Sequence, residues 1–396
     1  MKTLTYSKRL KLKLIQLKQV SNNARYELNG VRLQALRDLE GLSQTALASE
    51  LEVSQSFLSH IEKGNKPLPE TLAHSICIKF GLPLSFFTVQ PNLSGQFTFR
   101  KKMRASVRDE RRIKQLHDEA ARLFKVASEE SSYKFFRWED YGPLSDPEIA
   151  AEHIRGYFGI SPQGAVPNVV RLIERMGIGV ITDLDKYHSS VSDHAGISRP
   201  SESENRPIVA LVDQERGDVQ RMSLGHELGH LLFDRGLHNP IKSSRSNEEK
   251  RAFRFAGALL LPASEARLNI TESLPLHGYL PIKANFGLSV GALIYRARDL
   301  GLISSDRHRS LAIQLSSQGW RKNEPVEVRA EEPKLLTQAL ERAYGSAFIY
   351  PASEATGVQR NLITRWSMSS GAASEKFEEY GDVISLDSWK SSRSKG

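Results

Sequence analysis

The stretch LGHELGHLLF, residues 224–233, contains two histidines and a glutamate in the order His-Glu-x-x-His. His226 and His230 are four residues apart, so a helix places both imidazoles on one face. Glu227 lies one step round the same helix. Two imidazoles at this spacing are a common pair of zinc ligands, and the carboxylate between them is suited to activate a water molecule. The stretch therefore predicts a helix that carries part of a zinc site.

The residues around the two histidines predict that this helix is buried. Gly225 and Gly229 lower helix stability, but they allow another element to approach closely. The alternative is a core helix whose two histidines have only structural hydrogen bonds. The apolar residues that cover the other faces are Leu224, Leu228, Leu231, Leu232 and Phe233.

A third ligand decides the type of zinc site. The longer metzincin pattern needs a glycine and a third histidine at fixed steps, and Phe233 and Gly236 stand at those positions. Residues 247–262 instead predict a second helix with one apolar face, and Glu249 falls on that face. We therefore expect Glu249 to be the third ligand. His238 is the second choice, and a solvated carboxylate at Glu249 is the non-functional alternative.

These motifs resemble the ImmA/IrrE family of metallopeptidases. The resemblance covers roughly residues 150–310 and rests on RMSLGHELGHLLFD at 221–234, on the E-x-x-A-x-x-F-A pattern that begins at Glu249, and on LLLP at 259–262. Members are small zincin-like domains, mostly bacterial or phage, and several cleave a DNA-bound repressor. The resemblance implies one zinc ion per chain, held by His226, His230 and Glu249, with Glu227 as the general base.

The segment upstream of the zinc helix predicts a small sheet. A helix is expected at 168–176, followed by strands at 178–181, 194–198 and 207–213, and the zinc helix opens near residue 218. A peptidase also needs a donor for the oxyanion of its tetrahedral intermediate. The candidates are Tyr187, His188 and His194, and for each an ordinary structural role is the alternative.

A second motif lies near the N-terminus, in VRLQALRDLEGLSQTALASELEVSQSFLSHIEKGNKPLPETL at 31–72. Helices are predicted at 31–39, 44–51 and 55–63. Ser43 and Ser54 are positioned to cap the second and third helices. The pattern resembles the Cro/C1-type (XRE) DNA-binding domain, which implies that the third helix enters the major groove. A generic helical bundle is the alternative.

In that arrangement specific side chains would contact DNA. Gln55 is suited to a bidentate contact with adenine, whereas Gln44 at the start of the second helix is suited to a phosphate. Glu62 is expected to brace the fold. The residues expected at the double-stranded operator are Gln44, Ser54, Gln55, Ser56, Ser59, His60 and Lys63.

Composition agrees with an anionic partner. The 396-residue chain carries a net charge of +9 and has an isoelectric point near 9.4. Its first 30 residues hold seven Lys or Arg and one acidic residue, which predicts either a phosphate-contacting arm or a solvated tail. No stretch is long enough to span a membrane. The single cysteine, Cys77, excludes an internal disulfide and fits a reducing cytoplasm, and we expect it in the core.

The expected fold is α+β and mostly helical. The connector is basic and helical, and we expect a solvated spacer there, with dimer or DNA-backbone contact as the alternative. The C-terminal region is expected to pack or to dimerise. The predicted divisions are a basic arm (1–28), a helix-turn-helix domain (29–88), a connector (89–145), a zincin-like domain with a small sheet (146–310), a helical C-terminal region (311–387) and a disordered tail (388–396).

Together these features predict a cytoplasmic, homodimeric regulator. Its zinc-dependent endopeptidase domain would cleave a regulatory protein, either a partner repressor or the chain itself, and the connector is a candidate self-cleavage region. One alternative is a non-proteolytic transcription factor that uses the zincin-like domain as a ligand or metal sensor. Another is a regulator within a mobile-element, toxin-antitoxin or phage-defence locus.

Overall fold

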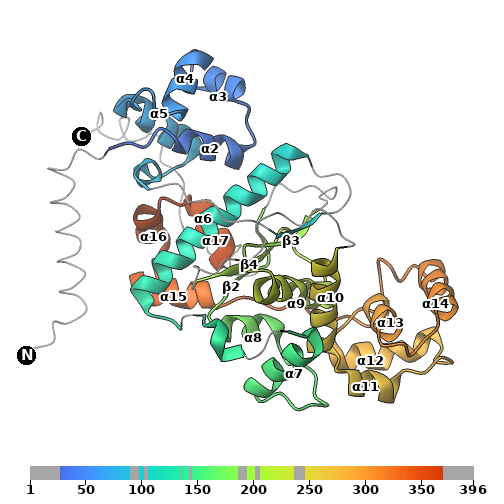
Figure 1. Cartoon of the computed structure of the whole chain (residues 1–396). Coiled ribbons are helices and arrows are strands. Elements are labelled where there is room, and N and C mark those ends of the chain that lie inside the picture. Colours follow the sequence, from blue (N-terminus) through green and yellow to red (C-terminus); the bar gives the residue numbers. More distant parts are fainter. Residues whose placement is uncertain are drawn as a thin grey trace, which may run out of the picture.

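The chain forms an α+β fold that is mostly helical, as the sequence predicted (Figure 1). The computed structural model describes residues 27–89, 98–101, 106–134, 136–141, 145–185, 194–200, 206–235 and 246–368. The basic arm up to residue 26 and the tail from residue 388 lie outside these ranges.

The N-terminal head contains the expected helix-turn-helix. The hydroxyls of Ser43 and Ser54 cap the second and third helices by accepting hydrogen bonds from backbone amides three residues later. Glu52 has φ 55°, which makes the tight turn between those two helices. The elements of the head are α2 (Arg32–Glu40), α3 (Gln44–Glu50), α4 (Gln55–Glu62), α5 (Glu70–Phe80) and the 3-10 turn η1 (Leu84–Phe87).

A four-stranded sheet lies at the centre of the molecule, in the order β1-β3-β4-β2. The strands are β1 (Thr98–Lys101), β2 (Gly179–Ile181), β3 (His194–Ser198) and β4 (Ile208–Leu211). β3 is antiparallel to both β1 and β4, whereas β2 and β4 are parallel. Three of these strands were predicted. The outer strand β1 was not, and it comes from the segment that was expected to be a helical connector.

The two faces of the sheet belong to two different cores. Along β4, Val209 and Leu211 point into one core and Ile208 and Ala210 into the other, as the alternation of a strand requires. The first core is enclosed by the helices of the second half of the chain, which include the zinc helix. These are α7 (Pro147–Tyr157), α8 (Val169–Arg175), α9 (Gly217–Phe233), α10 (Asn247–Leu260), α11 (Ala263–Asn269), α12 (Tyr279–Phe286), α13 (Val290–Asp299) and α14 (Ser305–Ser317), with the turns η2 (Trp138–Tyr141) and η3 (Leu276–Gly278).

The second core unites the head, the connector helix and the C-terminal helices. Its axis is α6 (Val107–Ser131), which contacts α2 of the head and β4 of the sheet. A Cβ atom added to Gly179 of β2 would lie 2.7 Å from the ring of Phe124, so α6 packs tightly on this face. The expected solvated spacer is therefore wrong for this helix. An apolar stripe of α6 faces the sheet, and two of its charged residues, Glu119 and Arg122, are buried as well.

The C-terminal helices fasten the head to the sheet, which fits the expected packing role. They are α15 (Leu335–Tyr344), α16 (Ile349–Thr356) and α17 (Arg360–Ser367). Gln359 donates a hydrogen bond to the Phe80 carbonyl of the head, at 3.2 Å. Trp366 donates to the Leu184 carbonyl beyond β2, also at 3.2 Å. Both ends of the described chain are thus fixed around one sheet.

None of the helices in the described ranges is both long and apolar enough to cross a lipid bilayer.

Candidate metal centre

Helices α9 and α10 cross at very short range because two glycines form the contact. A Cβ atom added to Gly229 would lie 3.0 Å from the Cα atom of Ala252, and one added to Gly225 would lie 3.2 Å from the Cβ atom of Ala256. The close approach that these glycines predicted is confirmed, and the approaching element is α10. This crossing brings the first turn of α10 beside the His-Glu-x-x-His turns of α9.

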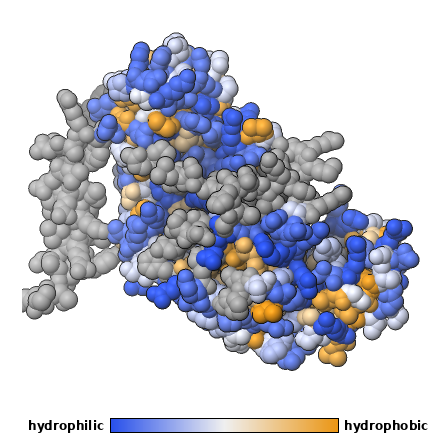
Figure 2. Space-filling model, viewed as in Figure 1, coloured by the Kyte–Doolittle hydropathy of each residue, from blue (hydrophilic) through white to orange (hydrophobic). Residues whose placement is uncertain are grey.

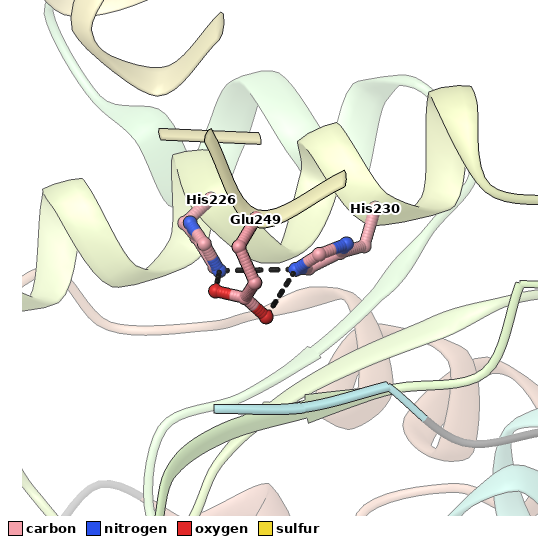
Figure 3. A group of neighbouring side chains, drawn as sticks. All are labelled: His226, His230 and Glu249. Atoms are coloured by element: carbon pink, nitrogen blue, oxygen red, sulfur yellow. Dashed lines mark hydrogen bonds and ion pairs between the residues drawn. The ribbon is translucent and has the colours of Figure 1, made fainter. Parts of the chain in front are cut away.

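Three side chains from the two helices converge on one point (Figure 3). The Nε2 atoms of His226 and His230 lie 3.0 Å apart. Each carboxylate oxygen of Glu249 lies 3.4 Å from one of these nitrogens. All three residues are buried, and their donor atoms lie within 4.8 Å of one another. The arrangement is the one that the sequence predicted for these residues, and Glu248 does not take part in it.

A further carboxylate orients His230. Asp234, one helical turn later at the end of α9, accepts a hydrogen bond from Nδ1 of His230 at 2.5 Å. Asp234 also forms an ion pair with Arg251 of α10. Because Nδ1 is engaged in this hydrogen bond, Nε2 is the nitrogen of His230 that faces the convergence point and would bind a metal ion in place of a proton.

The electrostatics of the cluster fit a bound cation. Burial opposes charge on His230, but the carboxylates of Asp234 and Glu249 outweigh it and raise its pKa to about 10. Burial also opposes charge on Glu249, but hydrogen bonds from the two imidazoles lower its pKa to about 2. The cluster thus stabilises positive charge at its centre. Two imidazoles and one carboxylate are a donor set that suits zinc.

Glu227 lies beside this cluster and is held by the sheet. Its Oε2 atom accepts a hydrogen bond from the hydroxyl of Ser198 in β3, at 2.7 Å, and both side chains are buried. The carboxylate packs against the backbone of Gly196, where an added Cβ atom would lie 2.7 Å from Oε1. A side chain at position 196 would therefore displace Glu227.

Sequence reasoning missed Ser198, Gly196 and Asp234. Asp234 carried a readable signal, since a residue four positions after a ligand histidine lies on the same helix face. Ser198 is 29 residues from Glu227 in the chain, and only the folded sheet brings them together. Of the expected oxyanion donors, His194 begins β3. Tyr187 and His188 lie outside the described residues, as does His238, the second choice for the third ligand.

The head presents the expected DNA-contacting residues at its surface. Gln55 donates a hydrogen bond to Gln44, and Gln44 donates one to Glu62 at 2.7 Å. Arg37 also pairs with Glu62, at 2.7 Å, so this glutamate braces three elements as predicted. Figure 2 shows that the face of the head in view is largely hydrophilic. Ser54, Gln55, Ser56, His60 and Lys63 are exposed, whereas Gln44 and Ser59 are half-buried.

Comparison with known families supports both halves of this description. Residues 173–298 match the IrrE N-terminal-like domain, and residues 30–84 match a helix-turn-helix domain. The HTH-type transcriptional regulator RamB from two strains of Mycobacterium tuberculosis is 41% identical to this chain over 61 residues. That match covers 15% of this chain and 13% of the relative. The chain therefore joins a helix-turn-helix domain to a metallopeptidase-like domain of the IrrE type.

Proposed function

We propose that the protein is a DNA-binding transcriptional regulator with a zinc-dependent endopeptidase centre that cleaves a regulatory protein, either a partner repressor or another copy of itself. The observation that carries this proposal is the convergence of His226, His230 and Glu249 beside the carboxylate of Glu227. A purely structural histidine pair has no need of a third ligand, an orienting aspartate and an adjacent base. The exposed recognition helix in the same chain indicates that the cleavage serves the regulation of genes.

The residues of the centre have separate roles in this proposal. His226, His230 and Glu249 would hold one zinc ion, which supplies a Lewis acid that activates water and polarises the scissile carbonyl. Glu227 takes the proton of the attacking water and passes it to the leaving amine. Ser198 keeps the Glu227 carboxylate in one orientation.

The proposal for the head follows from its exposed helix α4. Gln55 and Ser56 lie at the N-terminus of that helix, the end that faces base edges when such a helix enters the major groove. The hydrogen bond between Gln55 and Gln44 presents the two amides as one unit. Because operators of such domains are two-fold symmetric, we also propose a homodimer in the cytoplasm. Sedimentation analysis of the purified chain tests the dimer.

The central test compares the wild type with Glu227→Gln and Glu249→Ala. Zinc is measured by elemental analysis, and cleavage is followed by mass spectrometry on an unfolded casein and on the chain itself. The wild type is expected to bind about one zinc per chain and to cut. Glu227→Gln should keep the zinc and lose cleavage, whereas Glu249→Ala should lose both. Cleavage that survives in Glu227→Gln contradicts the assigned base.

A second function is favoured by one specific observation. All four side chains of the centre are almost completely buried, which suits a metal sensor that never admits a polypeptide. In that case the wild type binds zinc, cuts nothing, and changes its affinity for a selected operator when zinc is removed. Operator selection from random DNA, repeated with and without a chelator, separates this function from proteolysis.

A further inference from the structure

The outer strand β1 occupies the sheet edge beside the metal centre. It pairs with β3, and β3 is the strand whose Ser198 holds Glu227. β4 takes the other side of β3, so without β1 the strand next to the centre would be an edge of this sheet. Such an edge presents a row of unpaired backbone N–H and C=O groups, which readily accept another extended chain.

The pairing of β1 with β3 is short and irregular. β1 has four residues, and the register shifts between Phe99 and Lys101. Over that shift one residue of β1 stands opposite two residues of β3, and one of the two is Gly196. An extra residue interrupts the hydrogen-bond ladder and weakens it locally. The weakest part of the pairing therefore lies where β3 packs against Glu227.

The centre is closed in this structure. His226, Glu227, His230 and Glu249 are exposed by 0%, 1%, 1% and 3%, respectively. An endopeptidase has to bring an extended backbone within bonding distance of such groups. In Figure 3 the donor atoms point toward the side on which the light-blue ribbon of β1 passes. Removal of β1 would thus uncover backbone on the side toward which the reactive groups point.

We propose that the outer edge of β3 is the site where a substrate pairs as an extended strand, and that Thr98–Lys101 occupy this site as a displaceable internal strand. The proposal rests on the peptidase function proposed above. A chain that adds to a sheet edge binds through its main chain, so the substrate class is an unfolded or extended segment. Binding of the substrate requires that β1 leave.

The neighbours of β1 in the chain connect this exchange to the head. The turn η1 precedes β1 and α6 follows it, and both belong to the core that contains the helix-turn-helix. On both sides in the chain, β1 is therefore bordered by elements of the core that holds the head.

Phe99→Pro tests the proposal by weakening the β1 pairing, since proline cannot donate to a ladder. Hydrogen exchange should show loss of protection at those amides of residues 194–198 that point toward β1, while the amides that pair with β4 stay protected. A labelled peptide with the sequence of residues 96–103 should bind this variant and not the wild type in fluorescence anisotropy. Cleavage of unfolded casein should rise at least tenfold at unchanged zinc content. If β3 is uncovered and neither peptide binding nor cleavage changes, the proposal is overturned.

A reversible lock gives the opposite test in the full chain. Phe99 and Ile197 are direct partners across the two strands, so Phe99→Cys with Ile197→Cys can close a disulfide, in a Cys77→Ser background. The oxidised form should cut at least tenfold more slowly than the reduced form, whereas Phe99→Cys alone should not respond to oxidant. If Phe99→Pro does not fold, the double-cysteine variant alone decides. Equal cleavage rates in its oxidised and reduced forms overturn the proposal.

Failure of the peptidase function gives a different result. If no form cuts casein, but the labelled peptide binds Phe99→Pro and not the wild type, the strand-exchange site stands and proteolysis does not. If no form cuts and the peptide binds none of them, both proposals fail.

Discussion

At the scale of single residues, the centre depends on a side chain that binds no metal. Asp234 holds the proton on Nδ1 of His230 and also pairs with Arg251. Loss of such an outer carboxylate lowers metal affinity typically 10- to 100-fold, because the ligand ring loses its orientation and basicity. Asp234→Asn should therefore bind zinc about tenfold to a hundredfold more weakly. Competition with a chromophoric chelator measures this change.

The exposed Asp213→Asn is the matched control for that substitution, and its zinc affinity should equal that of the wild type. An unchanged affinity in Asp234→Asn would mean that Asp234 contributes nothing to the orientation of His230.

Residue patterns predicted the convergence at the centre only in part. Glu249 was found because it shares a helix face with Ala252 and Ala256, and that face is buried against α9. The support from Ser198 could not be found in the same way. A serine in a strand has many ordinary roles, and its partner Glu227 lies on a different element.

At the scale of elements, the crossing of α9 and α10 sets the geometry of the ligands. Gly229→Ala would place a methyl group 3.0 Å from the backbone of Ala252, so the helices must move apart. Overpacking of this kind costs about 1–3 kcal/mol, which the better helix propensity of alanine offsets only in part. Glu249 would then move away from the imidazoles. Both the zinc affinity and the free energy of unfolding should therefore be lower than in the wild type. Chelator competition and denaturant unfolding measure both.

Gly291→Ala is the matched control, since its added methyl group meets only the Ser289 hydroxyl, at 4.0 Å, within helix α13. This variant should be more stable than the wild type by roughly 0.5–1 kcal/mol, at unchanged zinc affinity. Equal behaviour of the two alanine variants would show that the crossing tolerates a side chain.

The packing of α6 on the sheet predicts a pH dependence. Burial and Arg199 lower the pKa of His117 well below its usual range, although the backbone of Ile208 hydrogen-bonds to the ring. The unfolded chain takes up a proton below pH about 6.5, whereas the folded chain does not. The contribution of His117 to stability is therefore present above pH 6.5 and is lost as the pH falls.

His117→Gln should remove this dependence. Between pH 6.5 and 5.5 the wild type should lose about 1 kcal/mol of unfolding free energy relative to the variant. Urea unfolding at both pH values tests this difference, with the exposed His153→Gln as the control that keeps the wild-type slope. Parallel slopes in the wild type and His117→Gln would mean that His117 is charged in the folded state.

The helices α3, α4 and α10 and the strands β2, β3 and β4 could be predicted because their own residues carry caps or an apolar pattern. The environment of α6 could not. Its charged N-terminal turns indicated a solvated helix, although Leu116 and Ala120 stood at helical spacing. Whether an apolar stripe on a charged helix is covered depends on distant partners. Here these partners are α2, α15 and β4.

At the scale of the whole molecule, a buried ion pair joins the head to α6, the helix that packs on the sheet. Arg32 of α2 donates to Glu119 of α6 at 2.9 Å, with both side chains 1% exposed. Glu119 also pairs with the buried Arg122 of α6. Removal of the shared carboxylate leaves two buried cations and costs about 3–5 kcal/mol, whereas replacement of a whole buried ion-pair cluster by apolar residues is often neutral. Glu119→Met should therefore lose about 3–5 kcal/mol of unfolding free energy, and Glu119→Met with Arg32→Met and Arg122→Met should regain most of it.

Denaturant unfolding of the single and triple variants checks this coupling. The exposed pair of Lys79 and Glu50 is the control, and Lys79→Met should change stability by less than about 1 kcal/mol. A triple variant no more stable than Glu119→Met would place the loss in packing instead of in the unpaired charges.

The shared core of the head, α6 and the C-terminal helices also has a consequence during protein synthesis. The helix-turn-helix leaves the ribosome before α16 and α17, whose apolar residues share a core with the head, have been made. A nascent or interrupted chain thus exposes an apolar surface next to its recognition helix, and such surfaces attract chaperones and proteases. Quality control in the cell would then remove incomplete chains before their helix-turn-helix could bind DNA without the rest of the molecule.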